Sequence, residues 1–345
     1  MDVRKNAVDL TDDERDRFLE AIVRLKHEPA PGAPSGVNVY DTFVALHGAV
    51  MGVVPPDGGD PVNYGHWDIG FCPWHRQYLR QFELALQEEV AGVTLPYWDW
   101  TAHPDAINFL FTPEFLSSLN IGFPRPVADG VLRDTVPDAE RPAWWPSGAT
   151  GFAIYGALGD GLGFQLTRGT AGGTWPPSAS AITALEQLVV EGPDFHPLWV
   201  FWMVLEQGHP NLTTATHNAA HNFVGGHMGR GFSPNDPIFW LHHANVDRIW
   251  ANWQARRLEA VPGSLAMDHW PPPDESSPLT GQPAPFGHRR DDPMWPWVNG
   301  ATGYQVVSVN DEVIQILSPF LAAQGLVRVS DVLDYTALGY EYAQA

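Results

Sequence analysis

Apolar residues recur at helical spacing along much of the chain. The first stretch follows a capping box, in which Thr11 is the N-cap and Glu14 is the third helical residue. The next two predicted helices run from about Val39 to Val54 and from Pro73 to about Val90, since proline suits the first turn of a helix. The spacing therefore predicts helices that bury one face.

Helical spacing is interrupted in the middle of the chain and then returns. Residues 101–180 are rich in Gly, Pro and Trp and show little periodicity, so we expect long ordered loops there. Asn235 and Pro237 are typical of a helix start and precede a long helical run. The helices predicted after the loops cover approximately residues 181–190, 198–207, 216–223 and 235–258.

Two β-rich runs lie further towards the C-terminal end. Tyr304–Val309 and Val313–Leu317 flank the turn-like segment 310–312, which predicts a small β hairpin. No internal repeat and no linker composition is visible. We therefore expect residues 1–345 to form one mainly α-helical domain with long ordered loops and a small β hairpin.

Composition narrows the class of protein. The 345 residues include 40 Asp and Glu against 19 Lys and Arg, a formal net charge of -21, which argues against nucleic acid or an anionic membrane as a partner. No apolar run approaches the ~20 residues that span a bilayer, and no signal peptide is visible. We expect a cytoplasmic protein, or one exported with a helper protein. Cys72 is the single cysteine, so no internal disulfide can form.

Histidine is abundant, and its placement points to chemistry. Five of the 14 histidines lie between His217 and His243. His217 and His221 are four residues apart, so a helix would present both on one face. A second group precedes them and consists of His47, His66 and His75. Any one of these could be an ordinary core histidine, but as a set the six indicate a metal site in a helical bundle.

The ligand types restrict the metal. Imidazoles without a thiolate or carboxylate partner suit copper, zinc, nickel or iron. Structural zinc usually takes cysteine, catalytic zinc often takes a carboxylate, and non-haem iron oxygenases take two histidines and a carboxylate. Two all-histidine trios are best suited to a pair of copper ions. A zinc-loaded structural protein is the least favoured alternative.

Several motifs resemble those of the tyrosinase family. Residues 217–221 and 234–250 resemble its second copper motif, and His47, His66 and residues 73–76 resemble the first. Residues 95–100 also match the family, and the resemblance covers nearly the whole chain.

The resemblance implies a type-3 dicopper centre in a four-helix bundle. One copper would be held by His47, His66 and His75. The other would be held by His217, His221 and His243, with His242 beside the ligands.

Two polar residues gain a role from the resemblance. A phenol, whose pKa is near ~10, must lose its proton before it binds a metal well, so a base is needed near neutral pH. Glu206 resembles the family glutamate that holds an active-site water, although its spacing to His217 is slightly longer here. Asn218 matches the asparagine that orients the same water. Otherwise they would be a helix-end carboxylate and a surface amide.

Departures from the family refine this interpretation. Tyr64 stands where fungal and plant members carry a cysteine cross-linked to a histidine, so we expect no thioether and a closer fit to bacterial tyrosinases. The loop 228–233 would lie over the copper pair, where Arg230 could bind a substrate carboxylate or point to solvent. No C-terminal shielding domain follows Tyr342, so we expect an open site.

The resemblance implies an enzyme that oxidises monophenols and o-diphenols with O2 to o-quinones. An o-aminophenol oxidase and a catechol oxidase on the same scaffold remain alternatives, and a haemocyanin-like O2 carrier is a further one. The expected partners are a phenolic small molecule, O2 and a copper-delivery helper protein of the kind bacterial relatives use.

Overall fold

Helices dominate the computed structural model, which describes residues 1–102, 105–170, 177–188, 196–208, 217–261, 270–278 and 280–343. The helices are α1 (Asp12–Leu25), α2 (Val39–Ala49), α3 (Phe71–Glu89), α4 (Asp105–Leu110), α5 (Ala179–Glu186), α6 (Pro197–Gln207), α7 (His217–Val224), α8 (Ile238–Ala260) and α9 (Asp311–Ala322). The strands are β1 (Asp2–Arg4), β2 (Val53–Val54), β3 (Arg125–Pro126), β4 (Thr167–Arg168), β5 (Pro293–Val298), β6 (Gln305–Val306), β7 (Leu326–Arg328) and β8 (Tyr340–Tyr342). The predicted mainly α-helical class is confirmed.

The predicted helix starts are close to those observed. The Thr11 hydroxyl accepts a hydrogen bond from the Glu14 backbone N–H, and the Glu14 carboxylate accepts one from the Thr11 N–H, so the capping box is present. Helix α3 begins two residues before Pro73. Helix α2 ends at Ala49, five residues earlier than predicted, because Val53 and Val54 pair with β6.

The hairpin prediction is wrong for residues 313–317. They lie in α9, whose N-cap Asn310 accepts a hydrogen bond from the Val313 N–H at 3.1 Å. Val313, Ile316 and Leu317 are buried at helical spacing, and α9 packs on α2. The β6 part of the predicted hairpin pairs instead with β2, antiparallel. Burial of one helical face therefore overrides the β propensity of the branched residues.

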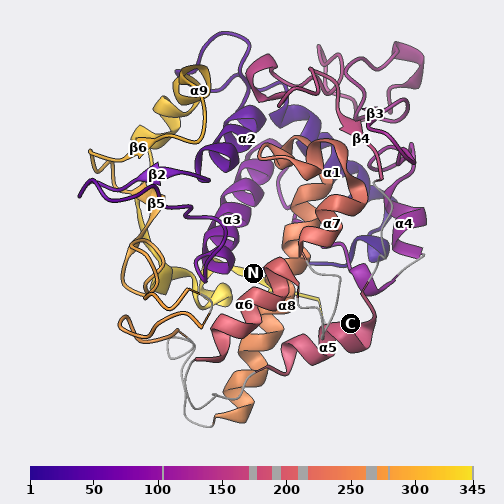
Figure 1. The fold of residues 1–345 in the computed structure, drawn as a ribbon. Coiled ribbons are helices and arrows are strands. Elements are labelled where there is room, and N and C mark those ends of the chain that lie inside the picture. Colours follow the sequence, from indigo (N-terminus) through magenta and orange to yellow (C-terminus); the bar gives the residue numbers. More distant parts are fainter. Residues whose placement is uncertain are drawn as a thin grey trace.

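Four helices meet near the middle of the molecule, α2, α3, α7 and α8 (Figure 1). Helix α8 packs against both α3 and α7. The Trp240 ring of α8 stacks on Phe82 of α3 with ring centroids 3.5 Å apart. The Trp240 Nε1–H also donates to the Tyr40 hydroxyl of α2 at 2.9 Å, so one buried indole joins three of the helices.

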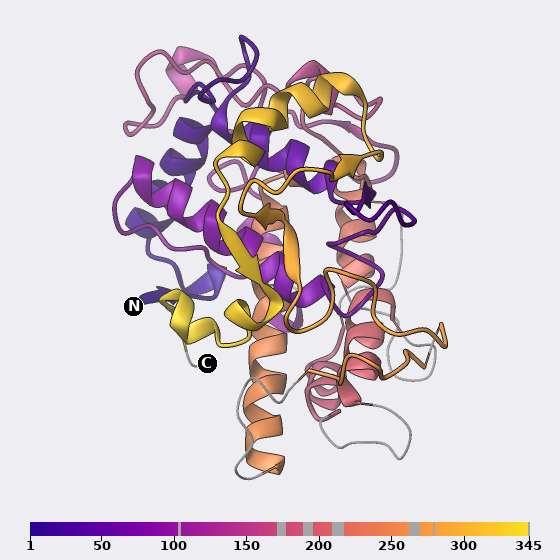
Figure 2. The ribbon, with the colours of Figure 1, turned by 90° about the vertical axis from the view of Figure 1, so that its left-hand side faces the viewer.

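The C-terminal segment packs onto the face formed by α2 and α3 (Figure 2). Helix α9 contacts α2, and β5 pairs antiparallel with β7 beside it. Strand β8 pairs with β1 in parallel, so both ends of the described chain join the same two-stranded sheet. None of the described helices is long and apolar enough to cross a membrane.

A buried ionic network ties β1, α3, α8 and β8 together. The Asp247 carboxylate accepts hydrogen bonds from the Arg76 Nε at 2.6 Å and from the hydroxyls of Tyr340 and Tyr342 at 2.5 and 2.6 Å. Arg4 lies 3.4 Å from the same carboxylate. Burial alone would raise the pKa of Asp247, but the two guanidinium groups outweigh it and lower that pKa.

This network lies next to the histidines. Arg76 directly follows His75 on α3, and Asp247 lies one helical turn after His243 on α8. The Arg76 Nη1 also donates to the Gln254 side chain at 3.0 Å, two helical turns beyond Asp247, so the guanidinium holds α8 at two positions. The pair therefore sets the register of two helices that bring His75 and His243 to the site.

Candidate metal centre

The first histidine trio comes from three separate segments. His47 lies on α2, His66 in the loop before α3, and His75 on α3. The Nε2 atoms of His47 and His66 are 3.2 Å apart, and the ring centroids of His66 and His75 are 4.9 Å apart. All three side chains are buried. Their ligand atoms lie close enough together to hold one metal ion.

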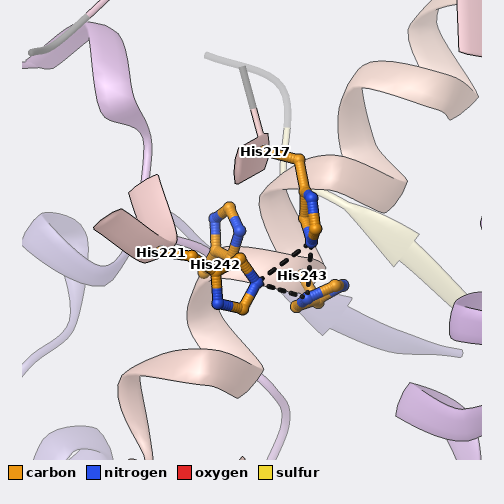
Figure 3. A group of neighbouring side chains, drawn as sticks. All are labelled: His217, His221, His242 and His243. Carbon is orange, nitrogen blue, oxygen red and sulfur yellow. Dashed lines mark hydrogen bonds between the residues drawn. The ribbon is translucent and has the colours of Figure 1, made fainter. Parts of the chain in front are cut away.

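The second trio comes from α7 and α8 (Figure 3). The Nε2 atom of His217 lies 3.0 Å from that of His221 and 3.2 Å from that of His243, and the last two are 3.3 Å apart. His217 and His221 are one helical turn apart on α7, so their rings project from the same face, as their spacing predicts. The three nitrogens converge on one point.

Backbone carbonyls fix the tautomer of three of the rings. The Nδ1 atoms of His47, His75 and His221 lie 2.7, 2.9 and 2.6 Å from the carbonyl oxygens of Gly231, Phe71 and Met228, respectively. Because a carbonyl only accepts, each Nδ1 carries the proton and each Nε2 presents a lone pair.

Side chains do the same for two further rings. The His66 Nδ1 donates to the Glu206 carboxylate at 3.2 Å, and the His217 Nδ1 donates to the Asn218 Oδ1 at 2.9 Å. The Asn218 amide nitrogen in turn donates to Gln207, which is consistent with this orientation of the amide. Partners of this kind orient the histidine ligands of metal ions and raise their basicity.

The arrangement fits a cation in each trio. In the pairs His47–His66 and His217–His221 the protons are on Nδ1, so the two Nε2 lone pairs face each other at 3.2 and 3.0 Å with no proton between them. Such contacts are repulsive unless a positive ion lies among the nitrogens. The Nε2 of His75 is likewise buried without a hydrogen-bond partner in the described part of the chain. Unpaired buried polar atoms of this kind call for an explanation, and a bound metal supplies one.

Burial keeps the imidazoles neutral. It lowers the pKa of His66 to about 3 and that of His221 to about 4. Burial and the neighbouring histidines lower the pKa of His75, His217 and His243 well below the ordinary value, and His47 behaves in the same way. Metal ligation requires the neutral imidazole, which is the form present at pH 7.

The two trios lie side by side at one pocket. The rings of His75 and His243 stack with centroids 4.3 Å apart, and those of His66 and His217 are 5.9 Å apart. A pocket of about 430 Å³ is lined by members of both trios. Two ions held there would face a shared space that a small aromatic molecule and O2 can enter.

One loop anchors both trios. Residues 228–231 supply the Met228 carbonyl to His221 and the Gly231 carbonyl to His47. The ring of Phe232, next in the chain, packs so closely on Gly48 that a Cβ atom there would collide with it. Glycine beside His47 therefore allows the loop to reach the first trio.

His242 lies close to the second trio but is oriented differently. Its ring stacks on that of His217, with centroids 5.1 Å apart, and contacts Trp100. It is within ligand distance of the trio, and both of its nitrogens lack hydrogen-bond partners among the described residues. In Figure 3 the dashed lines join His217, His221 and His243 only, so the converging nitrogens belong to the second histidine of the pair.

The remaining predicted residues also reach the pocket. Glu206 is buried on α6, and Asn218 lies on α7. Burial raises the pKa of Glu206 to about 7, although hydrogen bonds from Trp67 and Trp202 oppose this. Arg230 is exposed at the rim in the loop 228–231. The pocket lining therefore brings together all the predicted site residues except His75 and His243, whose rings contact those of His66 and His217.

Sequence reasoning missed two lining residues, Met51 and Trp67. Trp67 directly follows His66, and this position next to a predicted site residue was the only sequence signal that it lines the pocket. The Met228 and Gly231 carbonyls were also missed, since a backbone acceptor carries no signature in the residue type.

Comparison with known proteins indicates which family the chain belongs to. A family model described as the common central domain of tyrosinase matches residues 37–256. The tyrosinase of Streptomyces glaucescens is 37% identical over 270 residues, which are 76% of this chain and 85% of that protein. The chain belongs to the tyrosinase family. Among other members, the grixazone synthase of Streptomyces griseus is 33% identical over 80% of this chain and 92% of its own length.

Solved structures share the fold. A polyphenol oxidase from Thermothelomyces thermophila matches with a TM-score of 0.58 and 22% identity, covering 100% of this chain and 89% of that one. A functional unit of octopus haemocyanin matches with a TM-score of 0.54 and 20% identity, covering 100% of this chain and 68% of that one. The family and helical fold inferred from the motifs are thus confirmed, and the two histidine trios fit the two copper ions of the family.

Copper content should show which of the adjacent residues His242 and His243 is a metal ligand. We expect His243→Ala to reduce bound copper from two ions per chain to one, because it removes a nitrogen that converges on the second trio. The matched variant His242→Asn should retain two. Elemental analysis after copper loading measures the content, and circular dichroism checks folding. Greater loss of copper in His242→Asn than in His243→Ala would contradict this assignment.

Proposed function

We propose that this protein oxidises monophenols and o-diphenols with O2 to o-quinones, as a type-3 copper enzyme of the tyrosinase family. The observation that carries the proposal is the convergence of two trios of buried, neutral imidazoles at one pocket. The curated relatives named tyrosinase, at 35–37% identity over most of the chain, support the same activity.

Each copper ion has a proposed set of ligands. His47, His66 and His75 would hold one ion, and His217, His221 and His243 the other. Bound there, the pair of ions would supply O2 activation and electron transfer. The chain itself would bind the phenol in the pocket of about 430 Å³, orient its hydroxyl towards the trios and remove its proton.

Glu206 is the proposed proton acceptor. Its carboxylate lines the pocket and accepts hydrogen bonds from His66, the Trp67 backbone N–H and the Trp202 indole. All of these groups donate, so they favour the ionised form that can take a proton. Asn218 lines the same pocket and would orient a water for the transfer. Both residues also position a histidine, which links proton removal to the integrity of each trio.

Two further features belong to the proposal. Residues 1–345 would form a single catalytic domain, supported by the pairing of β1 with β8 and by the contacts of Arg4 with Glu83 and Asp247. Copper delivery by a helper protein, and export together with it, stays a prediction.

Monophenol oxidation should depend on Glu206 more than diphenol oxidation does. Copper-loaded protein should convert both tyrosine and catechol to quinones, followed by absorbance. We expect Glu206→Gln to lower kcat for tyrosine about 100-fold, the usual size of a general-base contribution, with a much smaller effect on catechol. A first proton is lost more readily from a catechol, so it needs the base less.

Two controls accompany this measurement. Glu186→Gln changes another buried carboxylate, which pairs with Arg256 away from the site, and should leave both rates unchanged. Copper content shows whether the loss reflects chemistry or an empty site. Equal losses on both substrates would argue against a base role, and reversible O2 binding without quinone formation would favour a carrier.

Arg230 is the proposed contact for a substrate carboxylate. It lies exposed at the pocket rim between two glycines. We expect Arg230→Ala to raise KM for 3,4-dihydroxybenzoate about tenfold, which corresponds to losing one charge-assisted hydrogen bond. KM for uncharged catechol should stay the same. An unchanged ratio of the two KM values would show that the guanidinium only faces solvent.

A further inference from the structure

An exposed indole stands at the mouth of the histidine pocket. Trp67 directly follows His66 and lines the same pocket as the two trios. Its side chain is 64% exposed, although tryptophan is among the residues that are most buried on average. Exposed aromatic surface beside a functional pocket commonly marks a binding site.

The backbone that carries this ring is held in an unfavourable conformation. Trp67 has a φ of 68°, in the left-handed region where a bulky residue is an outlier. Its N–H donates to both oxygens of the Glu206 carboxylate, at 3.0 and 3.1 Å. The following turn is closed by the Phe71 N–H, which donates to the Asp68 carbonyl at 2.9 Å. Strain of this kind persists where the surrounding structure enforces it, typically at functional sites.

The Glu206 carboxylate holds both the His66 ring and the backbone of Trp67. Glu206 accepts from the His66 Nδ1 and from the Trp67 backbone N–H, so the backbone that carries the exposed ring is held relative to the first trio. Trp67 and His66 also line a neighbouring pocket of about 460 Å³. The indole therefore forms part of the wall between two open spaces.

The pocket is larger than one phenol ring requires. Its volume of about 430 Å³ is within the range of pockets that hold drug-sized ligands. A phenol whose hydroxyl points towards the trios would extend its para substituent outwards to the rim. Trp67 offers an apolar ring face at that level.

We infer that Trp67 forms an outer subsite that stacks on an aromatic para substituent, so that the enzyme favours aryl-substituted phenols and catechols over single-ring ones. This inference rests on the proposed function, which it extends from a reaction to a class of substrate. Stacked aromatic pairs contribute beyond their buried area, and a tryptophan side chain, with only two torsions, loses little entropy on binding.

The test compares two substrates that differ only in the outer ring. In copper-loaded protein, Trp67→Ala should lower the ratio of kcat/KM for 4-phenylcatechol to kcat/KM for catechol about five- to tenfold, the size expected for one aromatic pair. Trp67→Phe should keep the ratio within about twofold, since it retains a ring. Phe164→Ala removes another exposed aromatic outside the pocket lining and should leave the ratio unchanged.

A binding measurement separates this inference from the proposed function. Calorimetry on metal-free protein should show weaker binding of 4-phenylcatechol to Trp67→Ala than to wild type, by a similar factor. If wild type oxidises neither substrate, the proposed function fails while the binding arm still tests Trp67. An unchanged ratio together with unchanged binding of 4-phenylcatechol overturns the subsite.

Discussion

Hydrogen bonds to the far nitrogens of the histidines determine what this site can be. Each Nδ1 that donates to a carbonyl, a carboxylate or an amide oxygen leaves a lone pair on Nε2. These lone pairs face each other at 3.2 Å between His47 and His66 and at 3.0 Å between His217 and His221. Burial prevents protonation from relieving the repulsion, because it lowers the pKa of every ring. A cation in each group turns these contacts into favourable ones, so the surrounding structure holds the nitrogens where a metal ion can bind.

Two parts of the fold provide that support. The buried pair of Arg76 and Asp247 joins α3 to α8 beside His75 and His243. The loop 228–231 reaches across the site and supplies one carbonyl to each trio, with the Phe232 ring seated on Gly48. Glu206 adds a third link, since it binds His66 and also sets the conformation of Trp67. Glu206 and Trp67, proposed for proton transfer and for substrate selection, are therefore linked directly to a proposed metal ligand, His66.

Much of this could be predicted from residue types and spacing. The second trio could be predicted from the sequence, because local signals set its side-chain directions. These signals are the helical spacing of His217 and His221 and the helix start before His243. The hairpin prediction failed because Val313, Ile316 and Leu317 suit a strand by type, whereas Asn310 caps a helix that packs on α2. The Gly231 carbonyl could not be predicted, since its place beside His47 depends on packing between segments far apart in the chain. The position of Trp67 after His66 was an indication, but its backbone conformation depends on Glu206 of a distant helix.

Anomalous diffraction at the copper absorption edge, from crystals of the copper-loaded protein, tests this account most directly. We predict two copper peaks, one bonded by the Nε2 atoms of His47, His66 and His75 and the other by those of His217, His221 and His243. A single metal ion, or coordination through Nδ1 or through His242, would contradict the central claim.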